Sequence, residues 1–345
     1  MSKALKEDKK DDKDAKSMLA IVVKILGEPD VMKLVTVPIP EIEPNQVLVR
    51  VEYAGVNPVD TYIRSGAFGK VPSLPYTPGK DGAGKIVKVG SGVTAFKVND
   101  LVWFCAAQTN PHGSYAEFAV VVWTDCWLLP KNVGLKVGAA LGVPYLTAYR
   151  ALIVKGKCKA GQTLFVHGAS GAVGQACVQI GKREGLKVVA TAGSECGEET
   201  LRSLKADAVF SHREKGYVDY VRDKFPDGFD LIVEMRADIN LGPDCILATR
   251  QGKILVVGNR GPTHTLNARH IMTSELYVIG VSLMQATRGE WDAGAAYVCK
   301  GVADGWLLPR ISKEYPLEEA PQAHTDITEA KEGANGKLLL KIYDD

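Results

Sequence analysis

The sequence predicts an α/β protein in which a doubly wound parallel sheet is inserted into a β-barrel-type domain. Two observations lead to this fold class. Residues 18–130 contain short alternating or apolar runs separated by Gly and Pro, which is typical of a compact β domain. From residue 137 to 281, short apolar runs alternate with segments of helical periodicity, which is typical of a parallel sheet covered by helices on both faces.

The strands of the first domain are predicted from period-two alternation and from β-branched apolar runs. They fall at residues 18–24, 46–53, 84–89, 98–104 and 116–123. The chain ends in GKLLLKI at 336–342, which also predicts a strand. A nucleotide-binding domain inserted between two parts of a β domain would explain this order. We therefore expect one β domain formed by 18–137 and 307–345, around a second domain at 138–306.

The second domain shows alternating strand and helix signals along its length. Buried strands are predicted at 163–166, 187–191, 208–210, 231–233, 254–257 and 276–281, and helices at 137–154, 171–184, 198–204 and 217–225. Continuous apolar strands of this kind are buried on both faces, because crossover helices cover the sheet on each side.

Length, charge and cysteine usage narrow the function classes. The chain has 345 residues, which suggests two domains, and a formal net charge of +2, which gives no argument for nucleic acid or an anionic membrane. No apolar run is long enough to span a bilayer. Residues 1–17 are mostly charged, and we expect a disordered extension rather than a signal peptide. Seven scattered cysteines without a CxxC pair indicate free thiols, and the cytoplasm is the expected compartment.

The motif most informative about function is the segment VHGASGAVG at residues 166–174. It follows a predicted strand and opens a predicted helix, which is the context in which glycines let the backbone approach a pyrophosphate. The spacing is G-x-x-G-x-x-G rather than G-x-G-x-x-G. A glycine-rich turn that only packs the helix on the strand is the alternative, but the repeated βα pattern favours a dinucleotide site.

The end of the next strand bears on which dinucleotide binds. NAD enzymes place an acidic residue there for the ribose hydroxyls, whereas this chain reads VATAG at 189–193 with no acid before Glu195. An acidic residue there would repel a 2′-phosphate, so its absence favours NADP. No Lys or Arg follows promptly, and Glu195, Glu198 and Glu199 crowd the next turn. His212 and Arg213, after the third strand, are the candidates to reach a 2′-phosphate, or they belong to an ordinary loop.

Several stretches together resemble a known family. They are GVNPVDTYIRSG at 55–66, LPYTPG at 74–79, the glycine segment, PYLTAYR at 144–150, SHRE at 211–214 and VVGNRG at 256–261. The chain resembles the medium-chain dehydrogenase/reductase superfamily, and within it the quinone oxidoreductase/zeta-crystallin branch, from about residue 18 to 342. The resemblance implies a GroES-like catalytic domain, an inserted Rossmann domain that binds NADPH, and homo-oligomers, either dimers or tetramers.

The resemblance also implies that no metal takes part. Alcohol dehydrogenases of the superfamily carry Cys at the position of Val56 or Asn57, and Gly-His-Glu at Gly79-Lys80-Asp81. A lysine is not the imidazole ligand that zinc requires at that place, and the four clustered Cys of a structural zinc lobe are absent from the sequence. We therefore expect zinc-independent reduction of an electron-poor substrate.

The family's site residues transfer to this chain position by position. Tyr62 and Asn57 are the candidate catalytic residues, and each has a structural alternative, as a packed aromatic or a turn residue. Asp60 and Arg64 are expected to form a local ion pair. The cofactor contacts implied are Tyr62, Ser170, Gly171, Ala172, Val173, Gly193, His212, Asn240, Val257, Gly258, Asn259, Arg260, Gly280, Val281 and Ser282.

Three functions remain open at this point. The resemblance implies NADPH-dependent one-electron reduction of quinones, such as ortho-quinones. The same scaffold also serves for reduction of alkenals or enones. A third alternative is a binding role, since relatives include lens structural proteins and binders of AU-rich RNA. The near-zero net charge weighs against RNA, and the intact glycine segment weighs against a purely structural protein.

Overall fold

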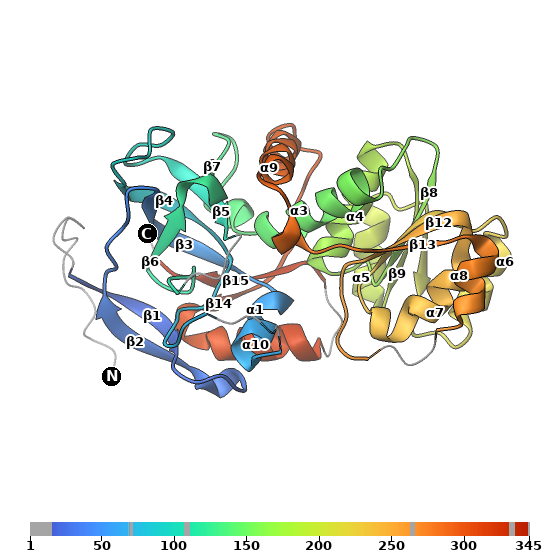
Figure 1. Ribbon diagram of the computed structural model, residues 1–345, viewed down its shortest axis with the longest axis horizontal. Helices are drawn as coiled ribbons and strands as arrows, with labels where there is room; N and C mark the ends of the chain where they lie inside the picture. Colours follow the sequence, from blue (N-terminus) through green and yellow to red (C-terminus); the bar gives the residue numbers. More distant parts are fainter. Residues whose placement is uncertain are drawn as a thin grey trace.

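The computed structural model describes residues 16–67, 69, 72–106, 111–262, 266–330 and 335–343. The prediction for the charged extension therefore lies, for residues 1–15, outside the described residues. Two sheets occupy opposite ends of the long axis of the molecule, and helices α3, α4 and α9 lie between them (Figure 1). The last strand, in red, returns to the blue and teal lobe that holds the N-terminal strands.

The first lobe is built on a mostly antiparallel sheet of order β14-β15-β3-β4-β5-β7, with β6 paired to β3 and a separate β1-β2 hairpin. Its elements are β1 Ser17–Val23, η1 Pro29–Val31, β2 Met32–Pro38, β3 Gln46–Val56, α1 Pro58–Ser65, β4 Asp81–Val89, β5 Leu101–Cys105, β6 Phe118–Val122, η2 Trp123–Asp125, β7 Cys126–Leu128, β14 Ile311–Pro316, η5 Leu317–Glu319, α10 Ala320–Glu329 and β15 Lys337–Lys341. Along β3, Val47, Val49 and Val51 are fully buried, because alternate β-branched side chains point into one core.

The second lobe is a parallel sheet of order β10-β9-β8-β11-β12-β13. Its elements are α2 Leu135–Gly138, α3 Gly142–Tyr149, η3 Arg150–Lys155, β8 Thr163–His167, α4 Ala172–Arg183, β9 Lys187–Ala192, α5 Glu195–Ser203, β10 Ala208–Ser211, α6 Tyr217–Lys224, β11 Phe229–Glu234, α7 Ala237–Leu247, β12 Ala248–Val256, α8 Ala268–Ser274, β13 Tyr277–Gly280, η4 Leu283–Gln285 and α9 Arg288–Ala303. Numbered along the domain, the strand order is 3-2-1-4-5-6, the doubly wound order of dinucleotide-binding domains.

Both faces of the parallel sheet are buried, as the continuous apolar strands predict. In β8, Leu164 and Val166 belong to one core cluster and Phe165 to another. In the neighbouring β11, Val233 and Ile232 divide between the same two clusters. Successive side chains of a strand point to opposite faces, so a strand with helices on both sides has no polar face. The α/β fold class, with a GroES-like and a Rossmann domain, is thus the observed one.

A stack of indole rings joins the two lobes. The centroids of Trp103 and Trp127, both in the first lobe, lie 4.6 Å apart, and Trp291 of α9 stacks on Trp127 at 6.2 Å. Trp103 is fully buried in the same cluster as the core of the parallel sheet. The hydrophobic core therefore continues from one lobe into the other. Within the described residues, no helix combines the length and apolarity that crossing a bilayer requires.

Candidate functional site

The predicted cofactor contacts of the second lobe all follow the carboxyl ends of its parallel strands. Strand β8 ends at His167 before the glycine segment, and β9 ends at Ala192 before Gly193. His212 follows β10, while Val257 follows β12. Carboxyl ends of parallel strands share one edge of the sheet, and β8 lies at the point where the strand order reverses. Segments that are far apart in the sequence therefore gather along one edge.

The glycine segment forms a tight turn into α4. Gly168 has a φ of +68°, a left-handed conformation that favours glycine. Gly171 is the N-cap of α4, with no side-chain cap, so the first N–H groups of the helix, at Ala172 and Val173, are not capped by a side chain. A Cβ at Gly174 would lie 2.4 Å from the Cα of Ala169, so only glycine lets the helix pack this closely on the turn. The arrangement is a cradle for an anion.

One end of this edge is formed by His212, Arg213 and Gly193. The Nδ1 atom of His212 lies 3.2 Å from the hydroxyl of Thr191, and Arg213 Nε donates to the carbonyl of Gly193 at 2.8 Å. A Cβ at Gly193 would lie 2.7 Å from His212 Nε2. Burial, followed by the charges of His167 and Arg213, lowers the pKa of His212 to about 4. The ring is neutral at pH 7, and the exposed Arg213 carries the local positive charge.

Sequence reasoning missed a buried cluster beneath the glycine segment. His167 Nδ1 lies 3.0 Å from a carboxylate oxygen of Asp244 and 3.0 Å from one of Glu234, and Nε2 lies 2.6 Å from the hydroxyl of Tyr217. Burial opposes a charge on His167, but Asp244 and Glu234 outweigh it and raise its pKa well above the usual value. The position of His167 directly before the glycines was the only signal in the sequence.

The protonation states of this cluster balance its charge. Burial and the neighbouring Glu234 raise the pKa of Asp244 well above its usual value. Burial also acts to raise the pKa of Glu234, but the hydrogen bond from His167 and its charge, together with hydrogen bonds from Asp244 and the Arg236 backbone, outweigh it, and the pKa is lowered. A neutral Asp244, an ionised Glu234 and an imidazolium at His167 sum to zero charge. One ligand atom from each of the three side chains lies within 4.8 Å of the others.

The other end of the edge contains the remaining predicted contacts. Asn240 Nδ2 donates to Glu234 at 3.1 Å, so the buried cluster orients this amide. A Cβ at Gly258 would lie 2.3 Å from the carbonyl of Met235. Arg260 Nη1 donates to the carbonyl of Thr328 in α10, which ties this loop to the first lobe. The other predicted contacts here are Val257, which follows β12, Asn259, and Gly280, Val281 and Ser282, at the end of β13 and after it.

Tyr62 brings the first lobe into the site. It lies in α1, which begins after Asn57 with Pro58 at its first position and a capping box from Asp60. The pKa of Arg236, which follows β11, is raised mainly by hydrogen bonds to Asp238, and Tyr62 makes a smaller electrostatic contribution. Tyr62, which is partly exposed, therefore lies within electrostatic range of the carboxyl edge of the parallel sheet.

Asn57 lies in a second buried cluster, with Asp81 and Lys337. Its Nδ2 atom donates to Asp81 Oδ2 at 2.9 Å, and its Oδ1 atom accepts a hydrogen bond from Lys337 Nζ. Lys337 also donates to Asp81 at 2.9 Å, and both Asp81 oxygens accept from the Val143 N–H. Asn57 is only 2% exposed, so a contact with a ligand would use no more than the edge of its amide.

The predicted ion pair between Asp60 and Arg64 is wrong. In the described part of the chain these two side chains form no salt bridge with each other; instead, Asp60 accepts a hydrogen bond from the Asn57 N–H at 3.0 Å. Burial, followed by the charge of Asp81, raises the pKa of Asp60 to about 7. Helix geometry explains the difference, because a side chain at the third helical position reaches back to the N-cap.

The donor set around Asp81 does not fit a zinc ion. Lys337 is an ammonium group and Asn57 an amide, and neither is a zinc ligand of the usual kind. Burial and then the charge of Asp81 raise the pKa of the Cys105 thiol well above its usual value, so it is not a thiolate. Lys80 is not a ligand either: its Nζ donates to the carbonyl of Ala106.

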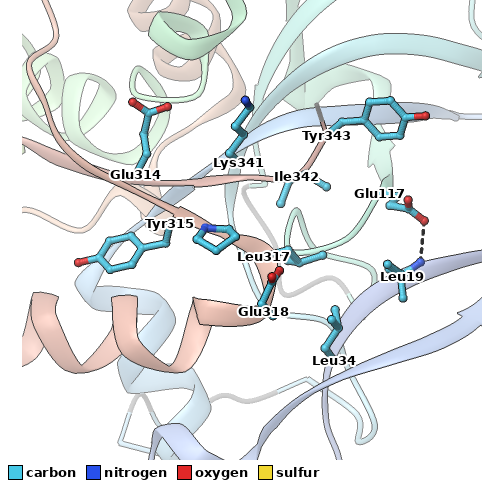
Figure 2. A pocket seen from close by; sticks show the side chains of 11 residues that line it. Leu19, Leu34, Glu117, Glu314, Tyr315, Leu317, Glu318, Lys341, Ile342 and Tyr343 are labelled. Atoms are coloured by element: carbon cyan, nitrogen blue, oxygen red, sulfur yellow. Dashed lines mark hydrogen bonds between the residues drawn. The ribbon is translucent and has the colours of Figure 1, made fainter. Parts of the chain in front are cut away.

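A separate groove lies on the first lobe, at β1, β14 and the chain's last strand. Figure 2 shows its apolar side chains, among them Leu34, Leu317 and Ile342. Its acidic side chains are Glu117, Glu314 and Glu318. Its volume is about 460 Å³, and its lining includes none of the predicted site residues.

Comparison with known proteins agrees with this geometry. The alcohol dehydrogenase GroES-like domain matches residues 43–131, and the zinc-binding dehydrogenase domain matches residues 172–298. The quinone oxidoreductase of Mus musculus is 46% identical over 333 residues, which cover 95% of this chain and 98% of that protein. The chain belongs to the quinone oxidoreductase family. The Homo sapiens quinone oxidoreductase is 44% identical over 334 residues, with the same coverage of both chains.

Solved structures extend the similarity to three dimensions. The Escherichia coli quinone oxidoreductase, solved in complex with NADPH, superposes with a TM-score of 0.85 at 25% identity, over 94% of this chain and all of that one. Although the second matching domain is described as zinc-binding, this member of the quinone oxidoreductase family places Lys337, Asn57 and Asp81 in one buried cluster with no zinc-ligand set.

Proposed function

We propose that the protein is a zinc-independent NADPH:quinone oxidoreductase. The observation that carries this proposal is the edge of the parallel sheet, which has an anion cradle at the start of α4 and a basic end at Arg213, in a chain of the quinone oxidoreductase family. In this proposal the substrate is a small electron-poor molecule, because a carbonyl of that kind accepts hydride or electrons without a Lewis acid, and the described donor set of Asn57, Asp81 and Lys337 does not fit zinc.

The residues along the edge fit a dinucleotide in one direction. The uncapped N–H groups of α4 and the turn from Ser170 would hold the pyrophosphate. Gly193, His212 and Arg213 would take the adenosine ribose and its 2′-phosphate, and the glycine at 193 leaves room for them. The nicotinamide end would then lie near Asn240 and Tyr62. NADPH supplies the electrons, or the hydride, that an electron-poor carbonyl accepts without a metal.

The chain's own contribution is orientation and hydrogen bonding. The Tyr62 hydroxyl donates to the substrate oxygen on which negative charge develops, which is the oxyanion-stabilising role. Asn57, anchored in its buried cluster, offers an amide N–H to the same region. Loops from both lobes exclude water from the reacting atoms. In our assignment, residues 18–137 and 307–345 form the catalytic domain, and residues 138–306 form the NADPH-binding domain.

The test is nicotinamide oxidation with matched acceptors. Purified protein is mixed with NADPH or NADH and either 9,10-phenanthrenequinone or an alkenal, and loss of nicotinamide absorbance is followed. Rapid quinone-dependent oxidation of NADPH, at least tenfold faster than with NADH, is expected. Tyr62→Phe should lower kcat about 10- to 100-fold with little change in NADPH affinity. Turnover of the alkenal alone would make enone reduction the function, and NADPH binding without turnover would make it a binding protein.

We also propose a cytoplasmic homo-oligomer, a dimer or a tetramer, as the working form. Light scattering coupled to size-exclusion chromatography would give the mass directly, and a monomeric mass of 37.2 kDa at micromolar concentration would refute it.

A further inference from the structure

Lys337 is a buried cation that the mechanism above does not use. It is 3% exposed, in β15 of the first lobe, and its ammonium group lies between Asn57 and Asp81. We propose that Lys337 is a positioning residue that makes Asn57 a hydrogen-bond donor toward the quinone carbonyl. This inference rests on the proposed quinone reductase activity and adds a residue that determines the chemistry of its site.

The orientation of the Asn57 amide follows from the chemistry of its two neighbours. An ammonium group can only donate hydrogen bonds, and an ionised carboxylate can only accept them. The Asn57 oxygen must therefore face Lys337, and its nitrogen must face Asp81, as observed. One N–H of the amide goes to Asp81, and the other has only a long contact of 3.4 Å with the Gly55 carbonyl. That second N–H is the group that Asn57 can offer to a carbonyl oxygen of a substrate.

Without the ammonium group, only the hydrogen bond to Asp81 holds this orientation. When the carboxylate is removed as well, the amide can rotate by 180° and present an acceptor instead, which would repel a carbonyl oxygen. The lysine and the carboxylate are closely packed against two glycines. A Cβ at Gly55 would lie 2.8 Å from Lys337 Cε, and one at Gly142 would lie 2.2 Å from Asp81 Oδ1. These two glycines make the space that the lysine and the carboxylate fill.

The position of Lys337 is also tied to the glycine segment of the other lobe. The Gly336 N–H donates to the carbonyl of Ser170 at 2.9 Å, and Gln175 Nε2 lies 3.4 Å from Asn335 Oδ1. The residue next to Lys337 therefore contacts the turn that would hold the pyrophosphate. This short span sets the distance between the pyrophosphate cradle and the amide of Asn57.

The experiment compares three variants in the quinone assay. Lys337→Met removes the ammonium group but keeps most of the volume. Asp81→Asn/Lys337→Met also removes the carboxylate, so that no unpaired charge is buried and the fold is preserved. Lys341→Met is the matched control, a lysine replaced at an exposed position of the same strand. For each, the melting temperature, the Kd of NADPH by fluorescence titration, and kcat and KM for 9,10-phenanthrenequinone are measured.

We expect kcat/KM for the quinone to fall at least tenfold in both Lys337 variants, with the NADPH Kd within threefold of the wild-type value. The melting temperature should fall in the single variant and recover in the double variant, while activity stays low. Recovery of activity together with the melting temperature would show that Lys337 only balances a charge and would overturn the inference. An unchanged kcat/KM in Lys337→Met would also overturn it. A wild-type protein without quinone turnover would instead refute the proposed function.

Discussion

Replacing His212 by Ala tests how the chain recognises a 2′-phosphate. In the free protein, burial and the nearby charges of His167 and Arg213 hold the pKa of His212 at about 4, so the ring is neutral at pH 7. The ring nevertheless lies against Gly193 and beside the guanidinium of Arg213. The question is whether the phosphate of NADPH would protonate the ring on binding.

The magnitudes favour a neutral ring. The pKa of His212, about 4, lies about three units below pH 7, so charging the ring at pH 7 would cost about 4 kcal/mol. Solvent screening of this partly exposed group reduces the cost to roughly 3 kcal/mol. A neutral imidazole N–H that donates to the phosphate already makes a hydrogen bond to a charged group, which contributes about 1.5–3 kcal/mol. Charging the ring would have to add more than its cost of roughly 3 kcal/mol to this bond. His212 should act as a neutral donor, and its loss should weaken NADPH binding about 13- to 160-fold.

The assay is NADPH and NADH binding by isothermal titration calorimetry at pH 7.5 and pH 5.5. The NADH affinity should be the same in wild type and His212→Ala. A group whose pKa rises on binding takes up a proton, so the contribution of His212 to NADPH affinity should grow as the pH falls. Arg213→Gln, which removes a permanent charge, should lose more affinity at pH 7.5 and should lose less at high salt. A loss above about 1,000-fold in His212→Ala at pH 7.5 would refute the neutral ring, and no loss would remove His212 from the site.

Three further substitutions test the packing that positions the site. Gly336→Ala would place an alanine at a φ of +100° with its Cβ 2.5 Å from the Arg310 carbonyl oxygen. We expect the unfolding free energy, measured by denaturation, to fall by about 1–3 kcal/mol. NADPH binding should also weaken, because Gly336 hydrogen-bonds to Ser170. Gly174→Ala should displace α4 and lower NADPH affinity at least tenfold, measured by fluorescence titration, since its Cβ would meet backbone atoms at 2.4 Å. Asp60→Asn should flatten the pH dependence of the unfolding free energy. In the wild type, the pKa of Asp60 is raised to about 7, so the folded state loses on the order of 4 kcal/mol of stability as the pH rises from about 4 to 7. An amide does not titrate and has no such loss. An unfolding free energy of Asp60→Asn that tracks the wild type from pH 4 to 8 would contradict this.

The sequence was most informative where one segment carries its own signal. Apolar strands alternating with helical periodicity predict the parallel sheet, and the observed order 3-2-1-4-5-6 has both faces covered, as Leu164 and Phe165 show by belonging to different core clusters. The glycine segment predicted a strand followed by a helix, and the structure places Gly168 in a left-handed conformation between β8 and α4. In both cases, local periodicity or backbone geometry determines the outcome.

The features that the sequence did not reveal depend on residues distant in the chain. Asn57 and Lys337 lie 280 positions apart, and a lysine at the start of a terminal strand reads as an ordinary solvated charge. Nothing local marks Trp103 and Trp291 as members of one aromatic stack between the lobes. The ion pair predicted for Asp60 and Arg64 failed for the opposite reason: a local spacing suggested it, but the helix N-cap competes for the same carboxylate.

The return of the C-terminal strand to the first lobe explains how the inserted domain and the first lobe form one site. Strand β15 pairs with β3 of the first lobe, while Gly336, just before it, hydrogen-bonds to Ser170 of the inserted domain. The segment that closes the first sheet is thus also the segment that contacts the pyrophosphate cradle. Because Lys337 directly follows this contact, the backbone that carries the ammonium group is anchored beside the glycine turn. A domain joined only by flexible linkers would have no such constraint. The fixed spacing between the pyrophosphate cradle and the Asn57 amide is therefore a consequence of inserting one domain into the other.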